Sequence, residues 1–65
     1  MKVVDIENRI AAIAAQQDDW EEAHSLEDKL YADVLRAIAA GASDGQALAA
    51  AALKSADLDF PRKFT

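Results

Sequence analysis

Apolar residues near the start of the chain recur with the period of an α-helix. Ile6, Ile10 and Ile13 follow one another at spacings of four and three residues, which places them in one narrow stripe. Asp5 precedes this stripe as a plausible N-cap, and neither Gly nor Pro interrupts the run. The pattern predicts a first helix near residues 5–17 with a coiled-coil-like seam.

The strongest helical pattern lies in the middle of the chain, where no Gly or Pro occurs from Trp20 to Ala40. At about 100° per residue, seven of its side chains fall within one arc, namely Trp20, His24, Glu27, Tyr31, Val34, Leu35 and Ile38. Gly41 can adopt the left-handed conformation that ends a helix. We therefore expect a long second helix near residues 19–40, with Ser25 as the alternative start because a capping-box pattern begins there.

A second capping-box pattern runs from Ser43 to Gln46 and predicts a third, alanine-rich helix near residues 43–55. Pro61 disfavours helical backbone at the residue before it, so the tail should leave the helix and fold back onto it. The expected fold is all-α: a small three-helix bundle with a long central helix and a packed C-terminal tail, in a single helical domain over residues 1–65.

The chain has many hydrophobic residues, but many of them have small side chains with few carbon atoms to bury. Of the 34 hydrophobic residues in this chain of 65, 16 are alanine, which buries little area. A chain this short is only marginally stable unless a disulfide, a metal, self-association or very regular packing helps it, and it has no cysteine. We therefore expect the second helix to bury its apolar face against another protein, most simply in a homodimer.

The formal net charge of −5 argues against binding to nucleic acid or to an anionic membrane, because both require clustered Lys and Arg. No apolar run approaches the roughly 20 residues of a membrane span, and the start of the chain lacks the pattern of a signal peptide. These observations predict a cytoplasmic protein whose partner is neither a membrane nor nucleic acid.

Catalytic and cofactor-binding patterns are missing from the sequence. There is no cysteine, the one histidine has no recognisable Ser-His-acid constellation, and the two glycines form no phosphate-binding loop. We expect neither an enzyme nor a bound cofactor.

Polar residues interrupt the apolar face of the second helix. His24 and Glu27 lie within the arc, with Glu21 and Asp28 near its rim. We favour a structural histidine that bonds across helices. The alternative is a metal-binding helical bundle, because Glu21-x-x-His24 has the spacing of half a di-iron site, and a symmetric dimer would supply the other half.

Aromatic residues supply the remaining candidates. Trp20 and Tyr31 serve either as core residues, which we favour for a residue on an amphipathic helix, or as interface anchors. Phe60, Arg62 and Phe64 either dock on a partner or belong to a frayed tail in which one phenylalanine packs against the bundle. The candidate interaction residues are Trp20, His24, Glu27, Asp28, Tyr31, Phe60, Arg62 and Phe64.

A second alternative is a helix-turn-helix regulator, since the run from Val34 through Gly41 to Leu53 resembles its first two helices. The segment after Leu53 is poor in the polar and basic side chains that read base edges.

Residues 19–62 resemble a family of small uncharacterised helical proteins of actinobacteria and their phages. The resemblance rests on Ala23-His24, Glu27-Asp28, Leu30-Tyr31, Val34-Leu35, Ile38-Ala39, Gly41, Leu48-Ala49, Ala52-Leu53-Lys54 and Asp59-Phe60-Pro61-Arg62. Where that family continues with a tryptophan and a small residue, this chain has Lys63-Phe64-Thr65.

The resemblance implies a polar cluster of His24, Glu27, Asp28 and Arg62, in which Arg62 binds the acidic face of the second helix and ties the tail down. It brings no activity with it. The expected function is protein–protein interaction, as a phage or prophage accessory factor that modulates a host protein.

Overall fold

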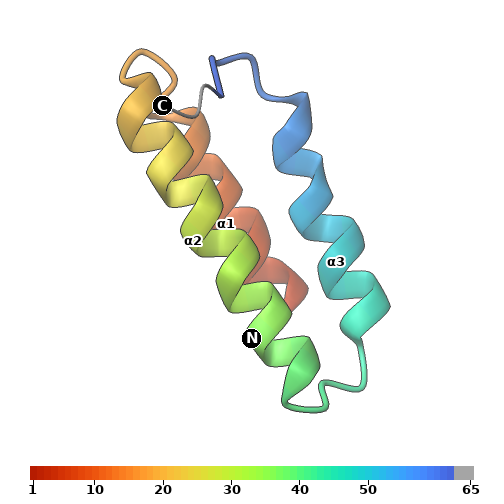
Figure 1. Cartoon of the computed structure of the whole chain (residues 1–65). Helices are drawn as coiled ribbons and strands as arrows, with labels where there is room; N and C mark the ends of the chain where they lie inside the picture. The colour runs from red at the N-terminus through yellow and green to blue at the C-terminus, as the bar shows by residue number, and fades with distance from the viewer. Residues whose placement is uncertain (63–65) are drawn as a thin grey trace.

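The computed structural model describes residues 1–62. Its helices are α1 (Val3–Ala14), α2 (Trp20–Ala39), α3 (Gly45–Leu53) and the short 3-10 helix η1 (Lys54–Asp57). The three α-helices run alternately up and down, and the tail returns from α3 to the N-terminal end of α2 (Figure 1). The expected three-helix bundle with a long central helix and a packed tail is therefore confirmed.

The first helix begins earlier than its sequence pattern predicts. Lys2, not Asp5, is the N-cap, and Asp5 lies in the first turn, where its Oδ2 accepts a hydrogen bond from the Lys2 backbone N–H at 2.8 Å. The carboxylate thus satisfies a donor at the positive end of the helix dipole. At its other end α1 stops at Ala14, three residues before the predicted boundary, and residues 15–18 form the turn that leads to α2.

Both ends of α2 follow the predicted signals. Asp19 is the N-cap, and its Oδ1 accepts a hydrogen bond from the backbone N–H of Glu22 at 3.3 Å. At the C-terminal end Gly41 has φ 97° and donates its N–H to the carbonyl of Ile38, while the next N–H reaches back to Ala37. This paired arrangement is a Schellman motif. The alternative start at Ser25 is wrong, because that residue lies inside α2.

The expected capping box of α3 is not formed. Asp44, not Ser43, is the N-cap, because the Asp44 carbonyl accepts the first helical bond, from Leu48 N–H at 3.0 Å, and no side chain caps the helix. After Leu53 the chain tightens into η1, so the regular α-helix ends two residues before the predicted boundary.

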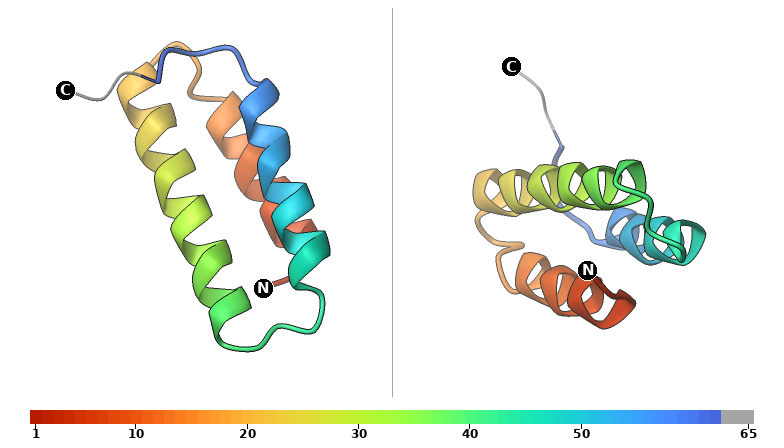
Figure 2. Two further views of the ribbon diagram at one scale, coloured as in Figure 1. Left: turned by 45° about the vertical axis from the view of Figure 1, so that its right-hand side comes forward. Right: turned by 90° about the horizontal axis from the view of Figure 1, so that it is seen from below.

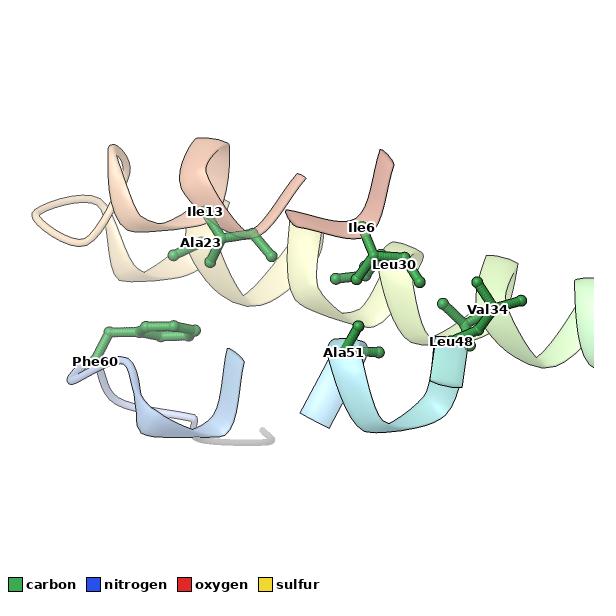
Figure 3. Close-up of a cluster of buried hydrophobic side chains, with 9 residues drawn as sticks. Ile6, Ile13, Ala23, Leu30, Val34, Leu48, Ala51 and Phe60 are labelled. Carbon is green, nitrogen blue, oxygen red and sulfur yellow. The ribbon is translucent and has the colours of Figure 1, made fainter. Parts of the chain in front are cut away.

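The core lies along the bundle axis and takes side chains from all three α-helices and from the tail (Figure 3). Its buried apolar members are Ile6, Ile13, Ala23, Leu30, Val34, Leu48, Ala51, Ala52 and Phe60. Phe60 lies at the same end of this cluster as Ile13 and Ala23 (Figure 3).

The buried face of α2 is rotated away from the centre of the predicted arc. Ala23, Leu30 and Val34 point into the core, whereas Trp20 is 38% exposed and Leu35 is 66% exposed. The core position that we favoured for Trp20 is therefore wrong. A helical projection gives the direction of each side chain but not the space available for it. It therefore did not show that Ala23 lies nearer the centre of the buried face than Trp20.

A surface ion-pair network joins α1 to α2. The Asp33 carboxylate binds Arg9 Nη1 and Arg36 Nη1, each at 2.9 Å. The hydrogen bond from Arg9 lowers the pKa of Asp33. Desolvation of the Asp33 carboxylate acts in the opposite direction but does not cancel this effect. Among residues 1–62, no helix combines the length and the apolar character needed to cross a membrane.

Candidate interaction site

A buried ion pair joins the tail to α2. Glu27 is 3% exposed and lies on the core face of α2, between Ala23 and Leu30. Arg62 Nε donates to Glu27 Oε1 at 2.8 Å, and Arg62 Nη2 donates to Glu27 Oε2 at 3.1 Å. A fork of two parallel bonds is the strongest common pairing of guanidinium and carboxylate, and it fixes orientation as well as distance. The Arg62–carboxylate pair that the family resemblance implied is present.

Two hydroxyl groups extend this pair across the bundle. Ser55 is fully buried, and its Oγ donates to Glu27 Oε2 at 2.8 Å. The same Ser55 Oγ is hydrogen-bonded to the Tyr31 hydroxyl. Because the single Ser55 hydroxyl proton goes to the carboxylate, Tyr31 must be the donor in the second bond. We call the connected set Tyr31, Glu27, Ser55 and Arg62 the tail latch.

Arg62 also binds the backbone of the segment that it closes. Its Nη2 donates to the carbonyls of Ser55 at 2.9 Å and Leu58 at 3.1 Å, and its Nη1 donates to the carbonyl of Phe60 at 3.2 Å. The guanidinium carbon lies 3.9 Å from the centroid of the Phe60 ring. The Ser55 carbonyl also accepts a hydrogen bond from the Leu58 N–H at 3.0 Å, whereas the Leu58 and Phe60 carbonyls lie beyond the 3-10 helix, where Arg62 supplies a partner.

The electrostatics of the latch favour its charged form. Burial alone would raise the pKa of Glu27, but hydrogen bonds from Arg62 and Ser55, with the positive charge of Arg62, bring this pKa below its ordinary value. The hydrogen bond to Glu27 raises the pKa of Arg62. Both groups are therefore ionised at neutral pH. Without a positive partner, burial would instead favour the neutral form of the carboxyl group.

The metal-binding alternative concerned His24 and its neighbours. His24 Nε2 lies 3.4 Å from Asp28 Oδ2, one turn further along α2. Within residues 1–62 of one chain, no group of three or more His, Asp or Glu side chains is placed to hold a metal ion. A site built by two copies around Glu21, His24 and Asp28 stays an untested prediction.

The helix-turn-helix alternative required a reading helix after Leu53. In the described part of the chain, Leu53 is followed by η1 and then by non-helical residues 58–62. Arg62, one of the few cations in this region, is bound to Glu27. Residues 54–62 thus contain nothing that matches a reading helix.

An apolar groove lies between α2 and α3, and we call it the α2/α3 groove. Its α2 side is lined by Tyr31, Val34, Leu35 and Ile38, and its α3 side by Ala49, Ala52 and Leu53. The groove has a volume of about 270 Å³. Leu35 and Leu53 are each 66% exposed, while Val34 and Ala52 are buried at its floor. Two projecting leucines therefore stand over a hollow floored by smaller side chains.

The sequence produces this groove by placing small residues where the two helices meet. Ala49 and Ala52 leave room on the α3 side that a longer side chain would fill. At the start of α3, Gly45 packs against Ile38, and a Cβ there would lie 3.3 Å from Ile38 Cγ1. The missing side chain thus brings the first turn of α3 close to the last turns of α2.

Tyr31 belongs to both features. Its ring lines the α2/α3 groove, and its hydroxyl donates to Ser55 in the tail latch. The hydrogen bond fixes the ring at one end of the groove. The latch therefore helps to set the shape of the groove wall.

The structure places the candidate residues in different parts of the molecule. Glu27, Tyr31, Phe60 and Arg62 come together, directly or through Ser55. His24 and Asp28 lie beside them on α2, whereas Trp20 is partly exposed at the start of that helix, and Phe64 lies outside the described residues.

Phe60 does not lie on the surface, where a docking role would need it. It is 5% exposed and forms part of the core, because the bent tail carries its ring back to Ile13 and Ala23. The alternative in which one phenylalanine of the tail packs into the core is therefore correct for Phe60. The tail around it is bound by Arg62, so it is not frayed there.

Sequence reasoning missed three residues of the site. Ser55 is not among the predicted candidates, although its spacing of seven residues from Leu48 places both on one helix face, and both are buried. Leu35 lies in the predicted apolar arc of the second helix, and no pattern in the sequence singles out Leu53 as a site residue. Nothing in the sequence showed that these two leucines would flank one groove.

Comparisons of the chain with protein-family models, with curated proteins and with solved structures gave no match.

Proposed function

We propose that this chain is a small acidic protein-binding module and that it binds its partner through the α2/α3 groove. The observation that carries the proposal is the pair of leucines, Leu35 and Leu53, each 66% exposed on either side of a wholly apolar hollow. A contiguous apolar patch of this kind is typical of an interaction surface, whereas single exposed leucines are ordinary.

Energetics support binding at this surface. Burying a leucine side chain is worth roughly 1.5–3 kcal/mol, and a core as thin as this one has little apolar material to spare. Two leucines left in water forgo that stabilisation within the chain. A partner that covers them recovers it as binding free energy.

The size and chemistry of the groove favour protein side chains over a small-molecule ligand. A volume of about 270 Å³ lies below the roughly 300–1,000 Å³ typical of pockets that enclose a small molecule. The lining offers little polar chemistry to orient a substrate, since the Tyr31 hydroxyl is bonded to Ser55. The hollow suits a few apolar side chains presented by another protein.

The tail latch supports binding by holding one wall of the groove in place before a partner arrives. Tyr31 is fixed by Ser55, and Ser55 is fixed by Glu27. A surface that is already ordered loses less conformational entropy on binding. The resemblance to small actinobacterial and phage proteins extends the proposal to an accessory factor that modulates a host protein.

A peptide-display selection tests this function directly. Random peptides are selected against the full chain, and each binder is measured again against Leu35→Asp and against the matched control Val4→Asp. Val4 is 54% exposed on α1 and does not line the groove, so both variants place a carboxylate at an exposed apolar position. Circular dichroism first shows that both variants are folded.

We expect the binders to lose at least about tenfold in affinity with Leu35→Asp and to change little with Val4→Asp. Burying one leucine contributes more than the roughly 1.4 kcal/mol that corresponds to a tenfold change in affinity. Binders that respond equally to both variants, or to neither, would overturn the proposal.

A further inference from the structure

We infer that the α2/α3 groove binds an amphipathic helix of another protein, and that this helix carries Lys or Arg at the end that lies over the N-terminal part of α2. This inference rests on the proposed function and adds the shape and the charge of the partner. Its basis is the placement of the three helices and the distribution of charge.

The shape of the partner follows from the two helices that form the groove. Viewed end-on, α1, α2 and α3 form a triangle, in which α1 lies across from the α2–α3 pair (Figure 2). Ile6 and Ile13 of α1 fill the inside of this triangle. The groove between α2 and α3 is where a fourth helix would pack, because rows of side chains on one helix fit between rows on its neighbours. Laying the apolar stripe of a helix into such a groove is a common mode of recognition.

Leu35 and Leu53 are suited to this packing. They stand at the two sides of the hollow, and the small side chains of Ala49 and Ala52 leave space between them. An incoming helix needs apolar residues at spacings of three and four to meet the hollow and both leucines. An extended segment would also bring unpaired backbone N–H and C=O groups to a wall that offers them few partners.

The charge of the partner follows from an acidic end of the molecule. Residues 16–28 contain six Asp and Glu residues and no Lys or Arg. The connection between α1 and α2 and the tail lie at the same end of the bundle (Figure 1), so Asp57 and Asp59 add to this charge. The opposite end carries both signs, with Lys2, Arg36 and Asp44.

Two exposed carboxylates bring this charge to the groove. Asp28 precedes Leu35 by two helical turns on α2, and Asp57 follows Leu53 by four residues in η1. All three arginines of the chain are already bound to carboxylates, Arg9 and Arg36 to Asp33 and Arg62 to Glu27. They are therefore poorly placed to neutralise this end. Lys29 and Lys54, which lie beside Asp28 and Leu53, offset part of its charge, but the eight carboxylates of residues 16–28 and 57–59 outnumber them.

The same charge favours a different protein over a second copy of this chain. Two copies would each carry a formal charge of −5 and repel one another as they approached. A basic partner would instead be attracted and oriented by the acidic end. The homodimer expected from the sequence is thus the competing occupant of the groove.

A charge-resolved peptide library tests the inference. Helical peptides carry leucine at fixed i, i+3 and i+7 positions, and Lys or Glu is varied at both ends. They are selected at low salt against the full chain. The double variant Asp28→Lys/Asp57→Lys is compared with Glu7→Lys/Asp44→Lys, which makes the same change in net charge away from the groove rim.

The expected result is enrichment of Lys at one end of the peptides. Affinity should fall by at least about tenfold in the rim variant and by no more than about threefold in the control, since each reversal turns a weak attraction into a weak repulsion. Peptides with Glu at that end should gain affinity in the rim variant.

Other outcomes overturn the inference in distinguishable ways. Peptides that need Leu35 but show no charge preference would contradict this inference and leave the proposed function intact. A library without any Leu35-dependent binder would overturn both. Sedimentation that found a dimer, abolished by Leu35→Asp and kept by Val4→Asp, would assign the groove to a second copy and exclude the basic helix.

Discussion

Arg62 and Glu27, which lie 35 residues apart in the sequence, bind each other through two parallel N–H···O bonds of 2.8 and 3.1 Å. The pair joins the tail to the middle of the longest helix. Three backbone carbonyls of residues 55–60 also accept hydrogen bonds from the same guanidinium. The tail is therefore part of the fold, and its closure stabilises both the core and one wall of the groove.

Replacing Arg62 by alanine is expected to destabilise the protein by about 2–3 kcal/mol. The substitution leaves Glu27 buried without its positive partner, and the half-buried position of Arg62 places the cost at the lower end of the range for broken buried pairs. Urea unfolding followed by circular dichroism measures it. The matched control is Arg36→Ala, which removes an exposed partner of Asp33 and should cost less than about 1 kcal/mol. Equal costs for the two variants would refute a special role for the tail latch.

Stability should fall as the pH drops below the pKa that Glu27 has in the unfolded chain, near 4.5. The folded-state pKa of Glu27 is lower than this value, so its stabilisation is complete above pH 4.5 and is lost as the pH falls through the folded pKa. Urea midpoints at several pH values should therefore bring wild type and Glu27→Gln closer together with increasing acidity. A difference between them that stays constant down to about pH 3 would show that the ionised carboxylate contributes nothing.

Phe60→Ala should cost roughly 3–5 kcal/mol, because it empties one end of the core beside Ile13 and Ala23. Leu53→Ala is the control, since that side chain is 66% exposed and should cost less than about 1 kcal/mol. The loss expected for Phe60→Ala is comparable with the whole free energy of unfolding of a domain of this size. The measurement is the folded fraction by circular dichroism at low temperature. A Phe60→Ala protein as stable as Leu53→Ala would show that the ring does not stay in the core.

Gly41→Ala should destabilise the turn between α2 and α3 by about 1–2 kcal/mol. Gly41 has φ 97°, and no atom lies within 4 Å of an added Cβ, so the cost arises from the backbone conformation alone. Gly41→Asn should recover part of the loss, because asparagine tolerates positive φ better. Thermal unfolding of the two variants gives the comparison. If alanine were tolerated as well as asparagine, the Schellman motif would not be the constraint that ends α2.

The fold was predictable because its signals are local. Asp19 and Gly41 mark the ends of α2 by capping chemistry that depends only on neighbouring residues. The end of α1 was less predictable, because nothing in the sequence after Ala14 forbids a helix and the turn is chosen by the packing of the bundle.

The site was harder to predict because it depends on how the helices are rotated about their axes. Leu35 and Val34 are neighbours in the sequence, yet Val34 faces the core and Leu35 the solvent. Adjacent residues of a helix point about 100° apart, and the predicted arc contains both of them without showing which one faces the core. The family resemblance implied that Arg62 binds the acidic face of α2, without singling out Glu27 as its partner, and helical periodicity alone does not place a residue beyond Pro61 against α2.

An NMR titration of the isotope-labelled chain with a selected basic peptide shows, residue by residue, whether the α2/α3 groove is the binding surface. We expect the largest amide shift changes at groove residues such as Leu35, Ile38, Ala49 and Leu53. Exposed residues of α1 such as Val4 and Glu7 should stay unchanged. Saturable shifts that gather on α1 and leave Leu35 and Leu53 unaffected would contradict this expectation.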